Sequence, residues 1–315
     1  MEFPADGLGA IPTRRNPWRE SNLNTDQQVK SSWPVFIESK DDIPITYKDF
    51  FKSFVVEGKS IPYTLRIPPT REGYIHMNPD KLICNLGNEI NILEKSENSF
   101  EAQRFPVEDI SYVEVTTILL SSSIKISGRM KQGAHASSTI KFNTVGDYLF
   151  EPILKTMRLA AGDMREAIWN SELNKFDRLI KLNIKFMNYA RHSLLAGEKV
   201  IHFILQPEIR VPGLKILGRI LFYKTISPAH MSILTDRELI MIREDENRNK
   251  FGKYGGIKDY IQLNKIESLT LSGKGNDLLV LSIQLPESDR LEFLYQASAK
   301  SELEQLLEWF GAVRA

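Results

Sequence analysis

The chain of 315 residues is long enough for about two domains of ordinary size, each with its own core. Its 41 basic and 40 acidic residues leave a net charge of +1, so no overall field attracts nucleic acid and an electrostatic partner must meet a local patch. The single cysteine, Cys84, excludes an intramolecular disulfide and a zinc site of several cysteines, and it fits a reducing compartment. We expect a cytoplasmic protein, because no signal-peptide pattern opens the sequence and no stretch approaches the roughly 18 apolar residues of a membrane-spanning helix.

An irregular N-terminal arm is predicted over residues 1–43. Up to about residue 32 it is rich in Pro, Gly and Asn and has no apolar periodicity. Trp18 and Trp33 would expose large apolar rings in a free tail. We therefore expect them to fasten the arm either to its own chain, which we favour, or to a neighbouring subunit.

A first domain is predicted over residues 44–160, with short strand candidates followed by one helix. Cys84 falls on a strand candidate, where it is either a small core residue, as we expect, or a reactive thiol. In the closing helix Tyr148, Leu149, Ile153 and Leu154 share one face, and Pro152 is tolerable only near the first turn.

A helical linker is predicted over residues 161–191. The helix begins after Gly162 with Asp163 as its N-cap. Its apolar positions follow the three-and-four spacing of an amphipathic helix: Ile168, Leu173, Phe176, Leu179, Ile180, Ile184 and Met187. We expect this stripe to pack in the seam between the two domains and to hold them as a rigid pair.

A second domain is predicted over residues 192–315. Its strands include a hairpin with a turn at Thr235-Asp236-Arg237, where Thr and Asp side chains can bond to nearby amides. Further strand candidates are residues 260–271, 278–285 and 291–295, and one amphipathic helix spans residues 301–310. The strands come first and the helix last.

Four blocks of this domain have counterparts, in the same order, in the first. Gly58 aligns with Gly197 and Asp80 with Asp236. Residues 105–113 then align with 260–269, and residues 138–158 with 290–310. The common order predicts that the first domain is a diverged copy of the second.

Residues 195–200, 234–240 and 301–309 together resemble a bacterial PH-like domain of the GRAM and YokE-like kind. The resemblance covers about residues 190–312. It implies an α+β fold of two PH-like curved antiparallel β-barrels, each capped by a C-terminal helix and joined by the helical linker. It also implies a binding or assembly module without catalytic residues. One departure is that residues 211–228 are longer and more apolar than the usual connection between the first two strands.

No enzyme motif is present in the sequence, and we predict no catalytic, cofactor or metal site. His76 and His230 align near equivalent places and are either a paired metal site or, as we expect, ordinary strand residues. The glycine-rich residues 252–256 resemble a phosphate loop, but they follow the acidic residues 244–246. We therefore interpret them as the end of a hairpin.

Two basic clusters are candidate contacts with a partner or with lipid. One is an expected hairpin tip in the first domain, and the other interleaves basic and apolar residues in the second. The candidates are Lys125, Arg129, Lys131, Arg210, Lys215, Leu217, Arg219 and Lys224. Either these residues contact an anionic membrane surface, or the apolar ones pack on the domain while the charges stay solvated. The Lys and Arg pattern of eukaryotic inositol-lipid sites is reproduced neither by Arg66 and Arg71 nor by Arg210 and Lys215.

Three functions remain open. The leading hypothesis is a non-enzymatic binding or scaffold module that pairs with a protein partner or with itself through open sheet edges. The alternative is peripheral binding to anionic lipid through residues 211–224. The third is a small-ligand or hydrolytic site between the domains, which requires a deep pocket with convergent titratable residues. Nucleic acid is not an expected partner.

Overall fold

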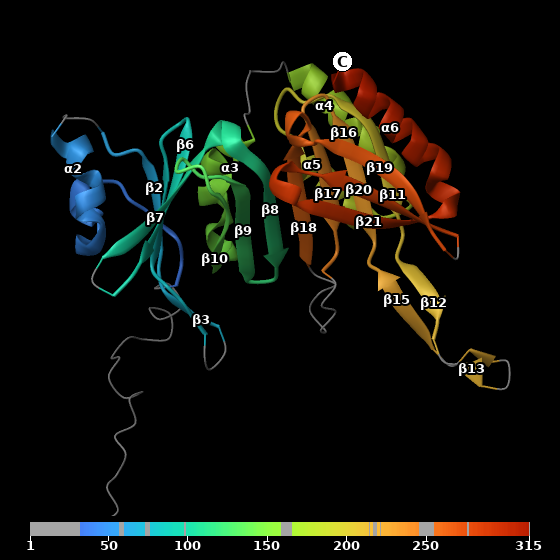
Figure 1. The fold of residues 1–315 in the computed structure, drawn as a ribbon, viewed down its shortest axis with the longest axis horizontal. Helices are drawn as coiled ribbons and strands as arrows, with labels where there is room; N and C mark the ends of the chain where they lie inside the picture. The colour runs from blue at the N-terminus through green and yellow to red at the C-terminus, as the bar shows by residue number, and fades with distance from the viewer. Residues whose placement is uncertain are drawn as a thin grey trace, which may run out of the picture.

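Figure 1 shows the fold in a computed structural model of the chain, which describes residues 32–56, 60–72, 76–97, 99–158, 166–213, 215–216, 219–220, 222–245, 255–275 and 277–314. Trp18, Gly58, Asp163, Leu217 and residues 252–254 lie outside them. The described chain is mixed α+β, and its sheets are antiparallel.

The first unit, residues 32–158, begins with a two-residue strand and a helix and continues with two sheets. The first sheet pairs its strands in the order β1-β2-β5-β6-β7 and the second contains β8, β9 and β10. Its elements are β1 (Val35–Phe36), α2 (Lys48–Val56), β2 (Tyr63–Ile67), β3 (Thr70–Glu72), β4 (His76–Asn78), β5 (Lys81–Asn85), β6 (Glu89–Lys95), β7 (Phe100–Pro106), β8 (Ile110–Ile118), β9 (Ser121–Arg129), β10 (His135–Asn143) and α3 (Glu151–Met157). Two residues of the predicted arm thus join the sheet.

The second unit, residues 166–314, repeats this order of elements. Two helices come first, then the strands β11, β16, β17 and β18, then the strands β19, β20 and β21, then a helix. Its elements are α4 (Glu166–Asn174), α5 (Ile184–Ser193), β11 (Val200–Gln206), β12 (Ile209–Pro212), β13 (Lys215–Ile216), β14 (Arg219–Ile220), β15 (Tyr223–Ser227), β16 (His230–Thr235), β17 (Glu238–Arg243), β18 (Gly255–Gln262), β19 (Ser268–Lys274), β20 (Leu278–Gln284), β21 (Arg290–Gln296) and α6 (Lys300–Arg314).

Each unit is therefore a four-strand meander, a 3-10 turn, a three-strand meander and a closing helix. The 3-10 turns are Val107–Asp109 and Leu263–Lys265. A hairpin follows the first long strand in both units: β3 with β4, and β12 with β15. The pairing changes one detail of the expected alignment. β5 takes the place of β16, so the position of Asp236 belongs to Gly87 and not to Asp80.

The core of each unit lies between its two sheets and is closed by the last helix. In the first unit Ile92, Ile124 and Ile153 belong to one buried cluster, and in the second Leu281 and Leu306 do. None of the sheets in the described residues closes on itself, so the expectation of barrels is wrong. The sheets stay open, and the side chains of α3 and α6 fill the gap between them.

A helix covers the outer face of each four-strand meander. Tyr47 and Phe51, beside and within α2, pack on the first sheet, and Phe186 of α5 packs on the second. Strands covered on both faces lose the alternation of buried and exposed residues. All six residues of β16 are buried for this reason, whereas the half-covered β10 alternates.

The linker does not form one helix in the seam. It divides into α4, the 3-10 turn Lys175–Leu179 and α5. Phe176 and Leu179 pack on the outer face of the second unit, and among the described residues of the first unit Val115 alone joins this cluster. Ile180 and Ile184 are 52% and 60% exposed, because the helical stripe ends at the break.

Candidate interaction surfaces

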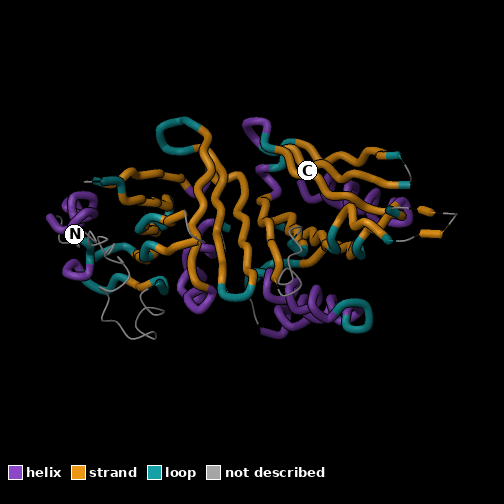
Figure 2. Tube along the Cα trace, turned by 90° about the horizontal axis from the view of Figure 1, so that it is seen from below, coloured by secondary structure: helices purple, strands orange, loops and turns teal. Residues whose placement is uncertain are grey.

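The two units are joined by strand pairing. β8 of the first unit pairs antiparallel with β18 of the second, from Val113 opposite Tyr260 to Ile118 opposite Gly255. We call this contact the seam. It merges a three-stranded and a four-stranded sheet into one sheet with the order β10-β9-β8-β18-β17-β16-β11. Figure 2 shows these strands side by side across the middle of the molecule.

Gly256 permits the close packing of β18 under α5. A Cβ atom at this position would lie 2.8 Å from the ring of Tyr189. At Gly255 a Cβ atom would lie 2.4 Å from the carbonyl oxygen of Thr117 in β8. The glycine-rich stretch predicted as a hairpin end therefore supplies, in residues 255 and 256, the first part of a buried strand.

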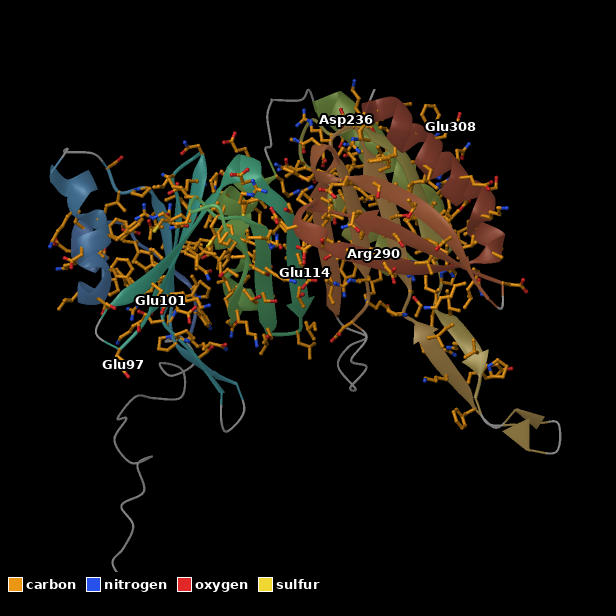
Figure 3. All side chains as sticks on the ribbon, in the orientation of Figure 1. Glu97, Glu101, Glu114, Asp236, Arg290 and Glu308 are labelled. Carbon is orange, nitrogen blue, oxygen red and sulfur yellow. The ribbon has the colours of Figure 1, made fainter. Side chains whose placement is uncertain are left out.

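Acidic residues from both sides of the seam share one arginine. Glu114 of β8 is directly opposite Asp259 of β18. The Arg243 guanidinium lies 2.7 Å from Glu114 Oε2 and 3.3 Å from Asp259 Oδ2. Burial raises the pKa of Asp259 to about 6, and the positive charge of Arg243 opposes that rise. Figure 3 labels Glu114 at this position.

A second ionic cluster fixes the end of α3 to the second unit. Arg158 is buried, and its Nη2 donates to Glu238 Oε2 at 2.7 Å and to the Ser193 carbonyl at 2.8 Å. Its guanidinium carbon lies 3.7 Å from the ring centre of Tyr260. Glu198, fully buried, lies 3.5 Å away. Burial and the nearby Glu238 raise the pKa of Glu198 to about 7.

Sequence reasoning missed both ionic clusters. Arg158 lies far from Glu198 and Glu238 in the chain, as Glu114 does from Arg243. The only local signal is the position of the two glutamates beside turns of the second unit. Charged residues at turns are ordinarily solvated, so this signal does not distinguish a buried pair.

In the described part of the chain, the edges that correspond to the seam strands pair with no further strand. By position in the repeat, β19 of the second unit corresponds to β8, and β7 of the first unit corresponds to β18. β19 is the last strand of its sheet on one side, and β7 ends the first sheet. Among the described residues, one backbone hydrogen bond reaches the outer side of β7, from the Lys131 amide to the Arg104 carbonyl.

The first basic cluster does not form one free patch. Lys125 Nζ donates to the hydroxyl of Tyr112 at 2.8 Å. Arg129 pairs with Glu287 in the other unit, and Lys131 lies 2.9 Å from Glu89. These cations therefore neutralise or bond to groups of their own chain.

The second cluster lies on a hairpin that projects from the second unit (Figure 1). Arg210 and Lys224 are exposed on β12 and β15, and Arg210 pairs with Glu208 at 2.6 Å. Phe222 and Tyr223 are 56% and 59% exposed. The backbones of Lys215 and Arg219 lie in β13 and β14, but their side chains, like all of Leu217, fall outside the description.

A groove of about 560 Å³ is lined by both units at the seam. Titratable residues line it, among them Lys155, His192 and Lys258. Lys155 pairs with Glu151 at 2.8 Å, and His192 Nδ1 lies 2.7 Å from the Asn188 carbonyl. Both contacts are made within one helix, in α3 and in α5 respectively.

His76 and His230, the candidate pair for a metal site, lie at different positions in their units. His76 lies in the inserted hairpin β3-β4 and His230 in β16, an inner strand between β17 and β11, so they are not equivalent. Burial lowers the pKa of His230 to about 4, and its Nδ1 lies 3.1 Å from the Pro228 carbonyl. Within the described residues no group of three or more His, Cys, Asp and Glu side chains is placed to hold a metal ion. Cys84 is buried, and burial raises its pKa to about 12.

None of the helices in the described part of the chain is long and apolar enough to cross a membrane. No protein-family model matches the sequence, and no curated protein is significantly similar to it.

Proposed function

We propose that the chain is a non-enzymatic binding or scaffold module made of two PH-like units, and that it binds partners by strand addition. The PH-like assignment is supported by the order of elements in each unit and by the resemblance of residues 195–200, 234–240 and 301–309. The observation that carries the binding mode is the seam, because β8 and β18 already join two units by pairing of sheet edges.

The edge of β19 is suited to receive a strand. Residues 268–273 contain no charge and no proline, the two features that commonly protect an edge. Thr270 and Ser272 are exposed, whereas Leu269 between Ser268 and Thr270 is buried against the core. A partner strand would therefore gain backbone hydrogen bonds without displacing core residues.

Introducing acidic side chains on this edge is expected to abolish association. In the double variant Thr270→Glu/Ser272→Glu, repulsion and the cost of desolvating two carboxylates oppose pairing. Sedimentation velocity and affinity capture should show assemblies for the unmodified chain that are lost in the variant. Gln296→Glu, an exposed change on β21 of the same sheet, is the matched control and should retain them. An unmodified chain that remains an inert monomer in both assays would contradict the proposal.

The second candidate is peripheral binding to anionic lipid through the hairpin of residues 211–224. It is favoured by the projection of this hairpin, which carries exposed Phe222 and Tyr223 beside Lys224. Aromatic rings beside cations are typical of surfaces that enter the boundary of an anionic bilayer.

If this candidate is correct, Phe222→Ser/Tyr223→Ser should weaken vesicle binding by about tenfold or more, since burying each large apolar side chain contributes about 1.5–3 kcal/mol. Co-sedimentation with phosphatidylserine-containing vesicles at low salt measures this. Trp309→Ser, which removes a half-exposed ring from α6, should leave binding unchanged. Equal binding by both variants, or none by the unmodified chain, excludes the hairpin.

A further inference from the structure

We propose that copies of this chain join head to tail, with β19 of one copy pairing antiparallel with β7 of the next in the register of the seam. The inference rests on strand addition as the proposed function and adds the partner, a second copy of the chain. It follows from the repeat. The seam joins a β8-type edge to a β18-type edge, and among the described strands each chain keeps one edge of each type that pairs with no other strand.

The residue correspondence comes from the 3-10 turns that precede the two three-stranded sheets. Aligning Val107–Asp109 with Leu263–Lys265 places Val113 on Leu269 and Glu114 on Thr270. Burial agrees with this alignment, since Val113 and Leu269 are both buried core residues. The same alignment of the turns makes Gln103 of β7 the counterpart of Asp259 of β18.

The pairs predicted across two copies can then be read from the seam. Thr270 opposite Gln103 replaces Glu114 opposite Asp259, and Ser272 opposite Glu101 replaces Thr116 opposite Ile257. Leu271 opposite Ala102 replaces Val115 opposite Lys258. No pair places two like charges together, so the electrostatics permit this register.

Backbone orientation fits as well. The Arg104 carbonyl points away from β6, because it accepts from Lys131. Orientation alternates along an antiparallel strand, so Ala102 and Phe100 also point outward. The residues of β18 that correspond to Ala102 and Phe100 are Lys258 and Gly256, which lie opposite Val115 and Thr117 in the seam. Val115 and Thr117 correspond in turn to Leu271 and Gly273 of β19. It follows that Leu269, Leu271 and Gly273 direct their backbone groups to the free side of β19.

Neighbouring structures also correspond. α2 covers the outer face beside β7 as α5 does beside β18. Glu89, at the start of β6, takes the place of Glu238 and is 8% exposed. The cation paired with Glu89 is Lys131, which belongs to the same unit. The cation paired with Glu238 is Arg158, which comes from the other unit. The buried carboxylate beside the β7 edge therefore has its cation without a second copy of the chain. A monomer needs no partner to neutralise this charge, so assembly can depend on concentration.

The contact would join two different edges, so every added copy again offers both. A heterologous contact of this kind gives open filaments or closed rings, whereas pairing of β19 with β19 would stop at a dimer. Growth beyond the dimer therefore distinguishes the two geometries.

The test uses single cysteines in the full chain. Gln103→Cys and Thr270→Cys are prepared separately, mixed and oxidised, because directly opposite residues of an antiparallel pair have the Cα spacing that a disulfide requires. The buried Cys84 stays in both chains. A shift from one chain to a covalent dimer is expected only in the mixture. The exposed pair Glu101→Cys and Ser272→Cys repeats the test if the first pair folds poorly.

Each other outcome overturns the inference in a different way. A dimer of Thr270→Cys with itself shows symmetric edge pairing, which contradicts head-to-tail joining but leaves strand addition in place. No dimer in any sample overturns self-assembly, while the acidic double variant on β19 separately decides whether that edge binds another protein.

Discussion

Replacing Arg158 with methionine is expected to lower the free energy of unfolding by about 3–5 kcal/mol at pH 8, the loss typical of breaking a buried ion pair from one side. Glu238 and Glu198 would remain buried without their cation. The contact between α3 and the second unit would weaken at the same time. Denaturant unfolding of the unmodified chain and of Arg158→Met measures the difference.

Two comparisons make this result specific. Arg290→Met removes an exposed arginine that pairs with Glu292, and we expect a loss below about 1 kcal/mol. At pH 5 the loss for Arg158→Met should shrink, because Glu198, whose pKa is raised to about 7 by burial and by Glu238, is then protonated and no longer a buried negative charge that needs the cation. Equal losses for the two variants, or a loss independent of pH, would show that Arg158 does not hold this cluster.

Proline at two equivalent positions is expected to have different consequences, a loss of stability at one and a loss of association at the other. Val115→Pro in the seam should destabilise the monomer by about 3 kcal/mol or more, because it removes a ladder hydrogen bond and a proline ring fits poorly inside a sheet. Leu271→Pro should cost the monomer far less, since its amide faces the free side of β19. It should nevertheless prevent association.

The pair is measured by denaturant unfolding at low concentration and by sedimentation at high concentration. The correspondence of β8 with β19 predicts that one variant loses stability and the other loses assembly. Similar stability losses for both would mean that the Leu271 amide is used inside the unit, and the derived register would be wrong.

Several elements could be predicted from the sequence because the residues that determine them are neighbours in the chain. The hairpin at Thr235-Asp236-Arg237 forms as predicted, and its Thr235 hydroxyl accepts from the amides of Arg237 and Glu238. The closing helix of residues 301–310 lies within α6, and Pro152 lies in the first turn of α3. These features need only neighbouring residues to be recognised.

Other predictions were wrong because contacts between residues far apart in the chain decide the structure at those positions. Residues 260–271 were predicted as one strand, but the chain changes sheets at Leu263–Lys265 and breaks there. Asp80 was aligned with Asp236 because both lie between apolar stretches, whereas strand order alone fixes the correspondence. The exposure of Tyr148, at 67%, also departs from the expected apolar face.

The seam itself has no local signature. Val115 and Lys258 are opposite each other only because two edges of the right kind meet. In the sequence both strands are ordinary short runs of mixed apolar and polar residues. The basic clusters, by contrast, were visible in the sequence, but the structure shows Lys125, Arg129 and Lys131 bound to groups of their own chain.

Hydrogen exchange as a function of protein concentration tests the central claim most directly. If free edges of the repeat join copies as the seam joins units, residues 99–103 and 268–274 should gain protection together as concentration rises. Peptides from β21, on the other edge of the same sheet as β19, should not change. Protection of neither region, or of β19 alone, would contradict the account.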